Sequence, residues 1–557
     1  MDINSLKESL AALLGVSADS FSYPPDSSLG DLSLATFKIA KEKGVSPVVW
    51  SEKTANELNS SADFLKYFEK ALAVGPYLNF FWSANYQDEI VKGILDNTSY
   101  GRRSSSGRRV VLEFANGNTH KEFHIGHLRN LSFGDSVRLL SEAAGDEVIT
   151  VSYVNDFGIN AAKTVWNWQR QPKYASLPGN KGFLLGKCYA EAANLLNEKP
   201  ELKSEVAEIK KEIENHQGDS YRLWQETRSW SLDYFQYIYK EMGISFVKYF
   251  YESEEIDEGR EICQELSGRG ILKQSEGAII ADLETYGLGF LPVIRSDGTA
   301  LYPVADFALA KKKFSLYSPD ESIYVVDIRQ SLYFKQLFKV LELAGYDKPF
   351  KHLGYDFVTL PSGMMSSRSG NIVTYDELKK LLLDKLQEET SSRHPDWTAE
   401  KISSVSWELA KATIKFEMLK VGADREIVFD IQSASRFDGY TVCYVFYTFA
   451  RLQSILRKEA LEEYTPGLLK EEKEKQLVVK LSKYPEISFS AYLKNDPSEV
   501  SKYVFELAQL LNDYYHSTNI LKADQASRQA RLSLIKAATI VMENSLGLLG
   551  IKPLAEM

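Results

Sequence analysis

Cysteine and long apolar runs are scarce in this chain of 557 residues, and each scarcity excludes a class of protein. Only Cys188, Cys263 and Cys443 are present, so neither a disulfide framework nor a Cys-x-x-Cys zinc site is available. No apolar run approaches the length that crosses a bilayer, and the opening residues carry acids in place of a basic leader. We therefore expect a soluble, cytoplasmic protein without a membrane anchor and without a metal site.

Charged residues are plentiful, and the charge of the chain excludes few classes of partner. The chain is 44% apolar and 25% charged, which at this length predicts three or four domains with proper cores. The net charge of −10 would disfavour a nucleic-acid partner if it were spread evenly. A ligand of that kind needs only a local basic track, so the question stays open.

A βαβ unit stands out between residues 108 and 156. The run RRVVLEFAN predicts a strand, a helical pattern follows through Leu128 and Leu140 to Gly145, and DEVITVSYVND predicts a second strand. Such units build parallel sheets, whose ligands lie at the carboxyl ends of the strands against helix N-termini.

The stretch NTHKEFHIGHLRN, residues 118–130, falls at that location. A helix N-terminus attracts phosphate through unpaired N–H groups and a partial positive charge. Gly126 would let a nucleotide lie against the backbone, His124 and His127 could both donate to phosphate oxygens, and Lys121 would add a full charge. The alternative is a solvated helix end, with one histidine capping the helix and the other on the surface.

Composition divides the chain into three parts. We expect a small α+β domain over residues 1–105, an α/β domain over 106–375 with a helical insertion at about 160–280, and an all-α region over 376–557. The basic and serine-rich segment 99–109 is interpreted as a flexible junction rather than a specific RNA contact.

Two motifs in this order resemble class I aminoacyl-tRNA synthetases. HIGH at 124–127 is similar to their first signature, and MMSSRSGNIV at 364–373 to their second. The nearest resemblance is to the arginyl family, through stretches such as YVNDFG, RSDGTALYPVADFA, YVVDIRQSLYFKQLF and LLGIKPLAEM. It implies a Rossmann-type parallel-sheet catalytic core with a helical insertion, a small α+β N-terminal domain and an all-α anticodon-binding domain.

The second signature departs from the usual class I pattern. Met364 and Ser367 stand where lysines are common, which leaves Arg368 as the nearby cation. Arginyl enzymes commonly place a lysine before HIGH instead, and Lys121 has that position, where it would stabilise the pyrophosphate end of ATP. The resemblance thus implies a catalytic set of Lys121, His124, Gly126, His127, Ser366 and Arg368, and an ATP site of His124, Gly126, His127, Met365 and Ser367.

An arginine site should offer carboxylates to a planar guanidinium with five donors. The positions that match the family's arginine pocket are Glu113, Asn118, Tyr302, Asp306 and Gln330. Asp306 follows Tyr302 by four residues at a predicted helix start, so the ring could cover a substrate held by the carboxylate. Taken singly, both acids could be ordinary strand-end and helix-start residues. The pocket rim departs from the family at Asn116, Gly117, Asn160 and Tyr333.

Contacts with tRNA are implied at both ends of the chain. Asn79 and Phe81 are candidate base contacts in the N-terminal domain, although GPYLNFF is equally typical of a buried strand. Tyr440, Tyr444, Tyr447 and Arg451 share one face of a predicted helix and could stack on bases and bind phosphate. The alternative is a core stripe, and Cys443 and Phe446 replace usual family residues there.

The sequence therefore predicts an arginine–tRNA ligase. It would use ATP with Mg²⁺ to activate L-arginine and transfer it to tRNA-Arg, and it would act as a monomer. Two alternatives stay open: another class I enzyme, including an adenylating enzyme that needs no tRNA, and a synthetase-like protein that binds tRNA or arginine without turnover.

Overall fold

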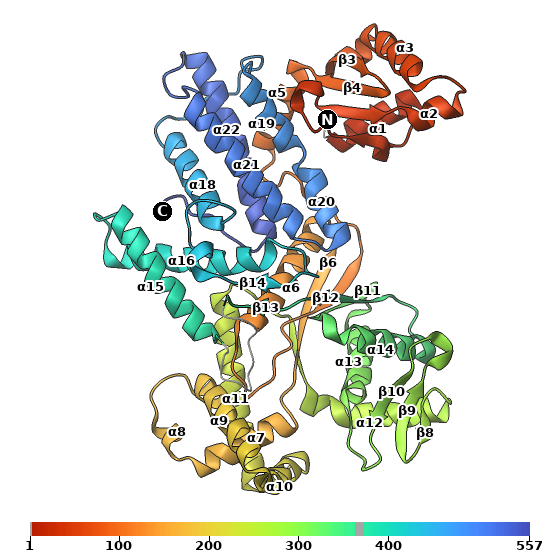
Figure 1. Ribbon diagram of the computed structural model, residues 1–557, viewed down its shortest axis with the longest axis vertical. Coiled ribbons are helices and arrows are strands. Elements are labelled where there is room, and N and C mark those ends of the chain that lie inside the picture. Colours follow the sequence, from red (N-terminus) through yellow and green to blue (C-terminus); the bar gives the residue numbers. More distant parts are fainter. Residues whose placement is uncertain (1–2, 362–372) are drawn as a thin grey trace.

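The computed structural model describes residues 3–361 and 373–557, and a parallel sheet lies at its centre (Figure 1). The strand order is β12-β11-β5-β6-β7, and all four neighbouring pairs are parallel. The bounds are β5 Arg109–Glu113, β6 Glu147–Val154, β7 Lys248–Tyr251, β11 Glu321–Asp327 and β12 Phe350–Tyr355. This sheet confirms the predicted Rossmann-type core.

Strand β5 is buried on both faces, as a central parallel strand should be. Val110 and Leu112 pack in one cluster with Leu128 of α6 (Ile125–Ala143). Val111, which points the other way, packs with Leu309 of α13 (Tyr302–Tyr317). The alternation follows from the two-residue period of a strand, and it fixes helices on both sides of the sheet.

Two groups of elements project from this core, at the lower left and lower right of Figure 1. The first is a set of helices, α7 Ile159–Arg170, α8 Lys173–Ser176, α9 Lys181–Glu198, α10 Lys203–Glu214 and α11 Gly218–Glu241. The second holds α12 Glu252–Gly268, α14 Ser331–Ala344 and an antiparallel sheet of β8 Lys273–Ser275, β9 Ala278–Asp282 and β10 Phe290–Ile294.

The N-terminal part is an antiparallel sheet covered by helices, in the strand order β1-β2-β4-β3. Its elements are α1 Ile3–Leu14, β1 Phe21–Ser22, β2 Leu32–Ala35, α2 Phe37–Glu42, α3 Pro47–Asn59, α4 Ala62–Leu65, β3 Phe68–Val74, β4 Tyr77–Trp82 and α5 Ala84–Asp96. The mixture of helices and strands confirms the small α+β architecture.

The C-terminal part is helical apart from a short parallel pair, β13 Val358–Thr359 with β14 Ile427–Val428. Its helices are α15 Tyr375–Arg393, α16 Ala399–Leu419, α17 Ile431–Ala434, α18 Val442–Leu456, α19 Glu472–Ser482, α20 Tyr484–Lys494, α21 Ser498–Ser517 and α22 Gln525–Leu548. None of the helices in the described ranges is long and apolar enough to cross a membrane.

The interpretation of residues 99–109 as a flexible junction is wrong. The amide of Arg103 donates to Ala143 O at 2.8 Å, and the amide of Ser106 donates to Gly145 O at 2.9 Å. Arg108 then binds Asp146, Glu321 and the Tyr492 hydroxyl, which belong to three distant segments. The small and basic residues therefore form a strap along the core, because backbone and guanidinium donors hold it there.

Candidate active site

A cavity of about 580 Å³ opens at the carboxyl ends of the central strands. Residues that follow β5, β6, β11 and β12 line it, together with the start of α6 and of α13. This is the location expected for a ligand of a parallel sheet. The predicted positions among its lining residues are Glu113, Asn118, His124, Gly126, His127, Tyr302, Asp306 and Gln330.

The two signature histidines form a reciprocal cap at the start of α6. The amide of Gly126 donates to His124 Nδ1 at 3.1 Å, and the amide of His124 donates to His127 Nδ1 at 3.1 Å. Each ring therefore carries its proton on Nε2 and keeps that N–H as a donor. Burial lowers the pKa of His124 to about 4 and that of His127 well below its usual range, so both act as neutral donors.

Gly126 leaves room for this cap. A Cβ at this position would lie 3.0 Å from Cε1 and 3.1 Å from Nδ1 of the His124 ring. A side chain here would crowd the ring, which would have to shift by a few tenths of an ångström. The glycine thus clears space for the histidine cap as well as for an approaching ligand.

Lys121 lies beside this cavity but does not line it. Its ammonium stands 5.2 Å from the centre of the Tyr189 ring and lines a second, adjacent cavity. Burial, and then the charge of Lys163, lower the pKa of Lys121. Lys121 in turn lowers the pKa of His124 and His127, so its charge is felt at the signature.

Glu113 ends β5 in the cavity wall, but its charge is already neutralised. Lys313 Nζ lies 2.6 Å from Glu113 Oε2, and both side chains are buried. Asn116 Nδ2 also donates to Glu113 Oε1 at 2.9 Å. The Lys313 ammonium further stands 3.8 Å from the centre of the Tyr324 ring. Glu113 can therefore contribute a hydrogen-bond acceptor to a ligand, but little net charge.

Asp306 has no ion pair of its own among the described residues, and Lys313, which pairs with Glu113, acts on it only through its charge. Asp306 stands in the second turn of α13, which begins at Tyr302 as expected, and the Tyr333 hydroxyl donates to it. Burial, opposed by that hydrogen bond and by the charge of Lys313, raises its pKa to about 7, and the nearby Glu113 adds to the rise. A buried carboxyl of this kind favours a cationic ligand, which would restore its ionised form.

The prediction missed Glu252, an acidic group that contacts the cavity lining without being part of it. Asn155 lines the cavity and donates through Nδ2 to Glu252 Oε2 at 3.2 Å. Burial raises the pKa of Glu252 to about 7, and the charge of Asp306 adds to the rise. A signal was present, because Glu252 directly follows the strand-like run KYFY and so stands at the carboxyl end of β7.

Asn130 is another functional residue that the prediction missed. From α6 it accepts a hydrogen bond from the Ala115 amide at 2.5 Å and donates to Val325 O at 2.8 Å. Ala115 is held at φ 59°, in the left-handed region that non-glycine residues rarely adopt. Asn130 thus joins the ends of β5 and β11 and fixes the turn that leads to the signature.

The predicted residues of the second signature, Met365, Ser366, Ser367 and Arg368, lie outside the described residues. Among the residues that are described, no group of three or more His, Cys, Asp or Glu side chains is placed to hold a metal ion.

The structure argues against Asn79 as a base contact. This residue of β4 is buried, and its Oδ1 accepts a hydrogen bond from Ser33 Oγ at 2.6 Å. Phe81 is partly exposed on the same strand, and the Lys70 ammonium stands 4.6 Å from its ring centre. The buried-strand alternative therefore holds for Asn79, while Phe81 still presents an accessible ring.

The four predicted contacts on α18 differ in their exposure. Tyr440 and Tyr444 are partly buried against Phe505 of α21, with ring centres 4.8 and 5.5 Å away. Tyr447 is 36% exposed, and Arg451 lies against its ring at 4.5 Å. Only the second half of the predicted stripe therefore offers an open aromatic and basic surface.

Comparison with known proteins gives two matches that together span most of the chain. Residues 89–431 match the family described as tRNA synthetases class I (R), catalytic domain, and residues 445–557 match the DALR anticodon binding domain. The arginine–tRNA ligase of Bdellovibrio bacteriovorus is 33% identical over 95% of this chain and 92% of its own length. That of Clostridium acetobutylicum is 31% identical over 96% and 95%.

Solved structures share the fold. The arginyl-tRNA synthetase of Thermus thermophilus aligns with a TM-score of 0.83 at 24% identity and covers 100% of this chain and 99% of its own. The enzyme of Plasmodium falciparum aligns with a TM-score of 0.79 at 19% identity, over 100% of both chains.

Proposed function

The chain belongs to the class I (R) tRNA synthetase family, and from that membership we propose how its site works as an arginine–tRNA ligase. The cavity at the strand ends binds L-arginine and ATP, forms arginyl-adenylate, and passes the arginyl group to the 3′ end of tRNA-Arg. The observation that carries this proposal is Asp306, a buried carboxyl of the cavity wall that has no ion pair among the described residues, together with Glu252, which is hydrogen-bonded to the lining residue Asn155.

Arginine recognition follows from the charges of the cavity. Because Lys313 neutralises Glu113, the guanidinium is bound by Asp306 and Glu252, and Tyr302 covers it from the start of α13. Tyr302 lines the cavity with an exposed side chain, and the pKa of Tyr302 is raised by burial and then by the charges of Glu252 and Asp306. Glu113, Asn118 and Gln330 supply hydrogen bonds to the remaining polar groups of the amino acid.

ATP binding follows from the start of α6. His124 and His127 each present an Nε2–H to the phosphates, beside the N–H groups of the helix start and next to Gly126. These donors are fixed before the reaction, so they can stabilise charge as the arginine carboxylate attacks the α-phosphate. Lys121 adds a long-range positive charge, and Met365, Ser366, Ser367 and Arg368 act from the second signature.

Mg²⁺ would enter with the phosphates of ATP. The described residues provide no acidic cage, and Mg²⁺ is commonly bound by substrate phosphates with few protein ligands. When bound, it neutralises charge on the leaving pyrophosphate.

The other parts of the chain serve tRNA. Residues 1–105 bind the outer corner of tRNA-Arg, with Phe81 as the accessible ring, and residues 376–557 read the anticodon, with Tyr447 and Arg451 as the open contacts. The catalytic unit spans residues 106–375, with its insertion at about 160–280. We also propose that the protein acts as a cytoplasmic monomer without membrane attachment.

The test is charging of purified tRNA-Arg with labelled arginine and Mg-ATP, together with arginine binding by calorimetry. The wild type should charge tRNA-Arg, Asp306→Asn should lose arginine binding and charging, and Lys211→Gln on the exposed face of α10 should behave as the wild type. A wild type that binds arginine or tRNA but forms no arginyl-tRNA would support a sensor without turnover.

A further inference from the structure

His120 is a third histidine of the stretch 118–130, and it is not among the described residues that line the candidate site. Its side chain is buried, and its backbone has φ 63°, in the left-handed region that residues other than glycine rarely adopt. A residue persists in this conformation only where the surrounding structure fixes it. The contacts of His120 therefore show what holds the loop of residues 118–123.

Both ring nitrogens of His120 have hydrogen-bond partners. Nε2 lies 2.9 Å from Thr227 Oγ1 of α11, and Nδ1 lies 2.8 Å from Thr119 Oγ1. The Thr227 hydroxyl donates to Leu223 O at 2.8 Å, so its oxygen accepts from Nε2–H, and Nδ1 accepts from the Thr119 hydroxyl. Burial and then the charge of Arg228 lower the pKa of His120 to about 3, so the ring is neutral and keeps this tautomer.

The backbone of His120 is bound to the helical insertion as well. Its amide donates to Ser231 Oγ of α11 at 3.0 Å, and its carbonyl accepts from Thr164 Oγ1 of α7 at 3.4 Å. Thr227 and Ser231 are four positions apart, so their hydroxyls lie on one face of α11. Two helices of the insertion therefore hold this residue through its side chain and its backbone together.

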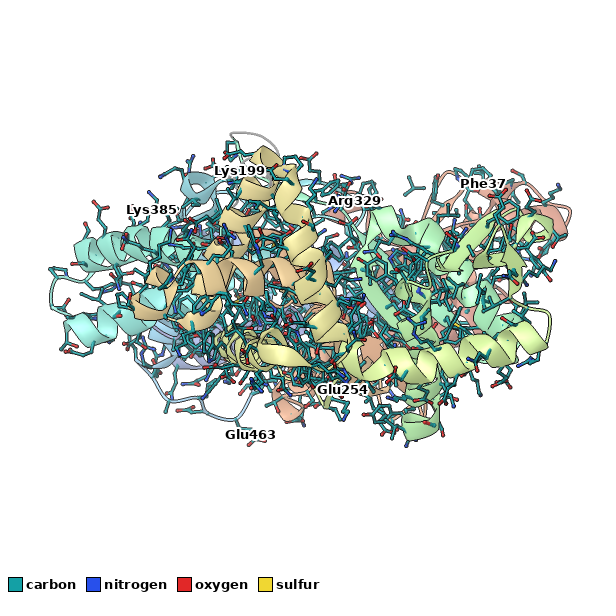
Figure 2. The ribbon with its side chains drawn as sticks, turned by 90° about the horizontal axis from the view of Figure 1, so that it is seen from below. Phe37, Lys199, Glu254, Arg329, Lys385 and Glu463 are labelled. Atoms are coloured by element: carbon teal, nitrogen blue, oxygen red, sulfur yellow. The ribbon has the colours of Figure 1, made fainter. Side chains whose placement is uncertain are left out.

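Helix α11 is itself fixed to the central sheet. Trp224 Nε1 donates to Asp156 O at 2.8 Å, and the Arg228 guanidinium binds the buried carboxylate of Asp156, two residues after β6 ends. Arg228 also reaches the exposed Glu254 at 3.4 Å, and Figure 2 shows Glu254 where the helical insertion meets the group that contains α12. His120 thus attaches the loop to a helix that is bound to the end of a central strand.

The loop that His120 holds carries a charge of the proposed ATP site. Lys121 comes next in the chain, and its charge lowers the pKa of His124 and His127. A change at His120 should therefore move the Lys121 ammonium relative to the signature histidines. The arginine end should be unaffected, because Asp306 belongs to α13 and not to this loop.

We propose that His120 is a positioning residue, whose hydrogen bond to Thr227 holds Lys121 where its charge acts on the phosphates of ATP. This inference rests on the proposed function, in which Lys121 supplies that charge. His120 lies behind the loop and acts only through Lys121. It gives a flexible side chain a fixed starting point, because a misplaced catalytic group loses much of its effect.

Two substitutions separate the ring nitrogens. The side-chain amide of glutamine reaches the position of Nε2, whereas the shorter amide of asparagine reaches only that of Nδ1. His120→Gln should keep most of the charging of tRNA-Arg, while His120→Asn should lower kcat/KM for ATP by up to about 10²-fold, the effect of a displacement of about 1 Å. Arginine affinity, measured by calorimetry, should be unchanged in both. Stability in urea should rank the variants in the opposite order, because asparagine tolerates the left-handed backbone better.

Further variants test the partners of this hydrogen bond. Thr227→Val removes the acceptor on α11 and should reproduce the loss of His120→Asn. Thr539→Val is the matched control, because Thr539 is a buried threonine of α22 whose hydroxyl also donates to its own helix, to Lys536 O at 2.8 Å. It should charge tRNA-Arg as the wild type does. In a Lys121→Ala background, His120→Asn should have no further effect on kcat/KM, because both changes act through one ammonium.

Other results would overturn the inference. Activity that follows stability, with His120→Asn more active than His120→Gln, would leave His120 a structural role only, and equal losses in both would show that the Nε2 bond is not needed. Additive losses from His120→Asn and Lys121→Ala would show that His120 does not act through Lys121. Each of these results, with a wild type that charges tRNA-Arg, contradicts this inference alone. A wild type that forms no arginyl-tRNA would overturn the proposed function as well.

Discussion

At the scale of single residues, ionisable side chains decide what the candidate site can bind. Glu113 and Asp306 both occupy predicted positions, but only Glu113 has a buried ammonium against it. The pocket is therefore prepared for one cation at the Asp306 and Glu252 end, and the affinity for that cation depends on whether these groups are ionised.

We expect arginine binding to weaken as the pH falls through about 7. Burial raises the pKa of Asp306 and of Glu252 to about 7 in the free protein, so both carboxyls take up protons below that pH and lose the charge that holds a guanidinium. The dissociation constant should rise up to about tenfold per pH unit for each group that must ionise. Calorimetry from pH 5.5 to 8.5 measures it.

Glu252→Gln is the matched control for this dependence. It should bind arginine more weakly at pH 8 and show a shallower slope below pH 7, because one titrating group remains. A wild-type affinity that does not change between pH 6 and 8 would contradict the assignment. In the absence of ligand the sign for stability is opposite, because a raised carboxyl pKa makes the fold less stable as the pH rises toward 7.

Removing Lys313 should strongly destabilise the protein. Lys313→Met leaves Glu113 buried without its partner, and breaking a buried pair in this way costs about 3–5 kcal/mol. The free energy of unfolding in urea measures the loss. The double variant Glu113→Gln/Lys313→Met should recover a large part of it, since no uncompensated charge remains, and equal losses in both variants would show that the ion pair is not the cause.

The sequence allowed part of this residue-level arrangement to be predicted. The four-residue spacing of Tyr302 and Asp306 placed both on one helix face correctly. The same periodicity carries Lys313 to that face, seven residues after Asp306, but nothing in the run AKKKF showed that a strand-end acid would meet it. Such pairing depends on β5 and α13, which lie 200 positions apart at Glu113 and Lys313.

At the scale of elements, the start of α6 combines a structural and a chemical task in the same two rings. His124→Ala removes the acceptor for the Gly126 amide and should lower the free energy of unfolding by about 1 kcal/mol. His124→Asn restores a capping oxygen and should keep the stability. Both should reduce kcat/KM for charging by about 10²–10³, since neither places an imidazole N–H at the phosphates.

Urea unfolding and charging rates, measured on the same preparations, separate these two tasks. An Asn variant that charges tRNA at the wild-type rate would show that the Nε2–H of His124 is not needed.

The sequence pattern predicts the strands, the helix and the parallel order around α6, because β-branched runs alternate there with helical periodicity. The sequence pattern does not predict the reciprocal cap of His124 and His127, because the orientation of these rings depends on their burial by neighbouring segments.

At the scale of the whole molecule, contacts between distant segments join the parts of the chain. Lys415 of α16 donates to Gly550 O at 2.8 Å and lies 3.4 Å from Asp135 of α6, while Ser136 donates to Leu548 O at 2.7 Å. The helical C-terminal part is thus fixed directly on the signature helix. No local pattern predicts these contacts, and for the same reason the composition of residues 99–109 indicates a flexible junction where the structure has a strap.

We expect Arg108→Gln to weaken the contacts between these distant segments and so to lower the free energy of unfolding. Its guanidinium binds Asp146, Glu321 and Tyr492, and the Asp146 side chain is only 1% exposed, so this acid would keep its hydrogen bonds from Ser106 and Tyr492 but lose its cationic partner. The loss should be about 1–3 kcal/mol in thermal or urea unfolding. Arginine affinity should stay unchanged, because these contacts lie at the opposite ends of the strands from the cavity.

Arg109→Gln is the control at the neighbouring position. Arg109 pairs with Glu147 at the surface, where both side chains are 42% and 60% exposed, and such pairs contribute about 0–1 kcal/mol. Equal effects of the two substitutions would show that the Arg108 contacts do not join the parts.

Because the histidines at the start of α6 are neutral, ATP binding and arginine binding should respond differently to pH. Their rings stay uncharged from neutral pH down to about 4 for His124, so the handling of phosphate is insulated from mild acidification. Arginine binding is sensitive to mild acidification, because the carboxyl groups of Asp306 and Glu252 titrate near pH 7. At pH 6 turnover should therefore be restored by extra arginine and not by extra ATP. Acidification would then slow this enzyme in the same way as a shortage of arginine, by leaving the amino-acid site empty.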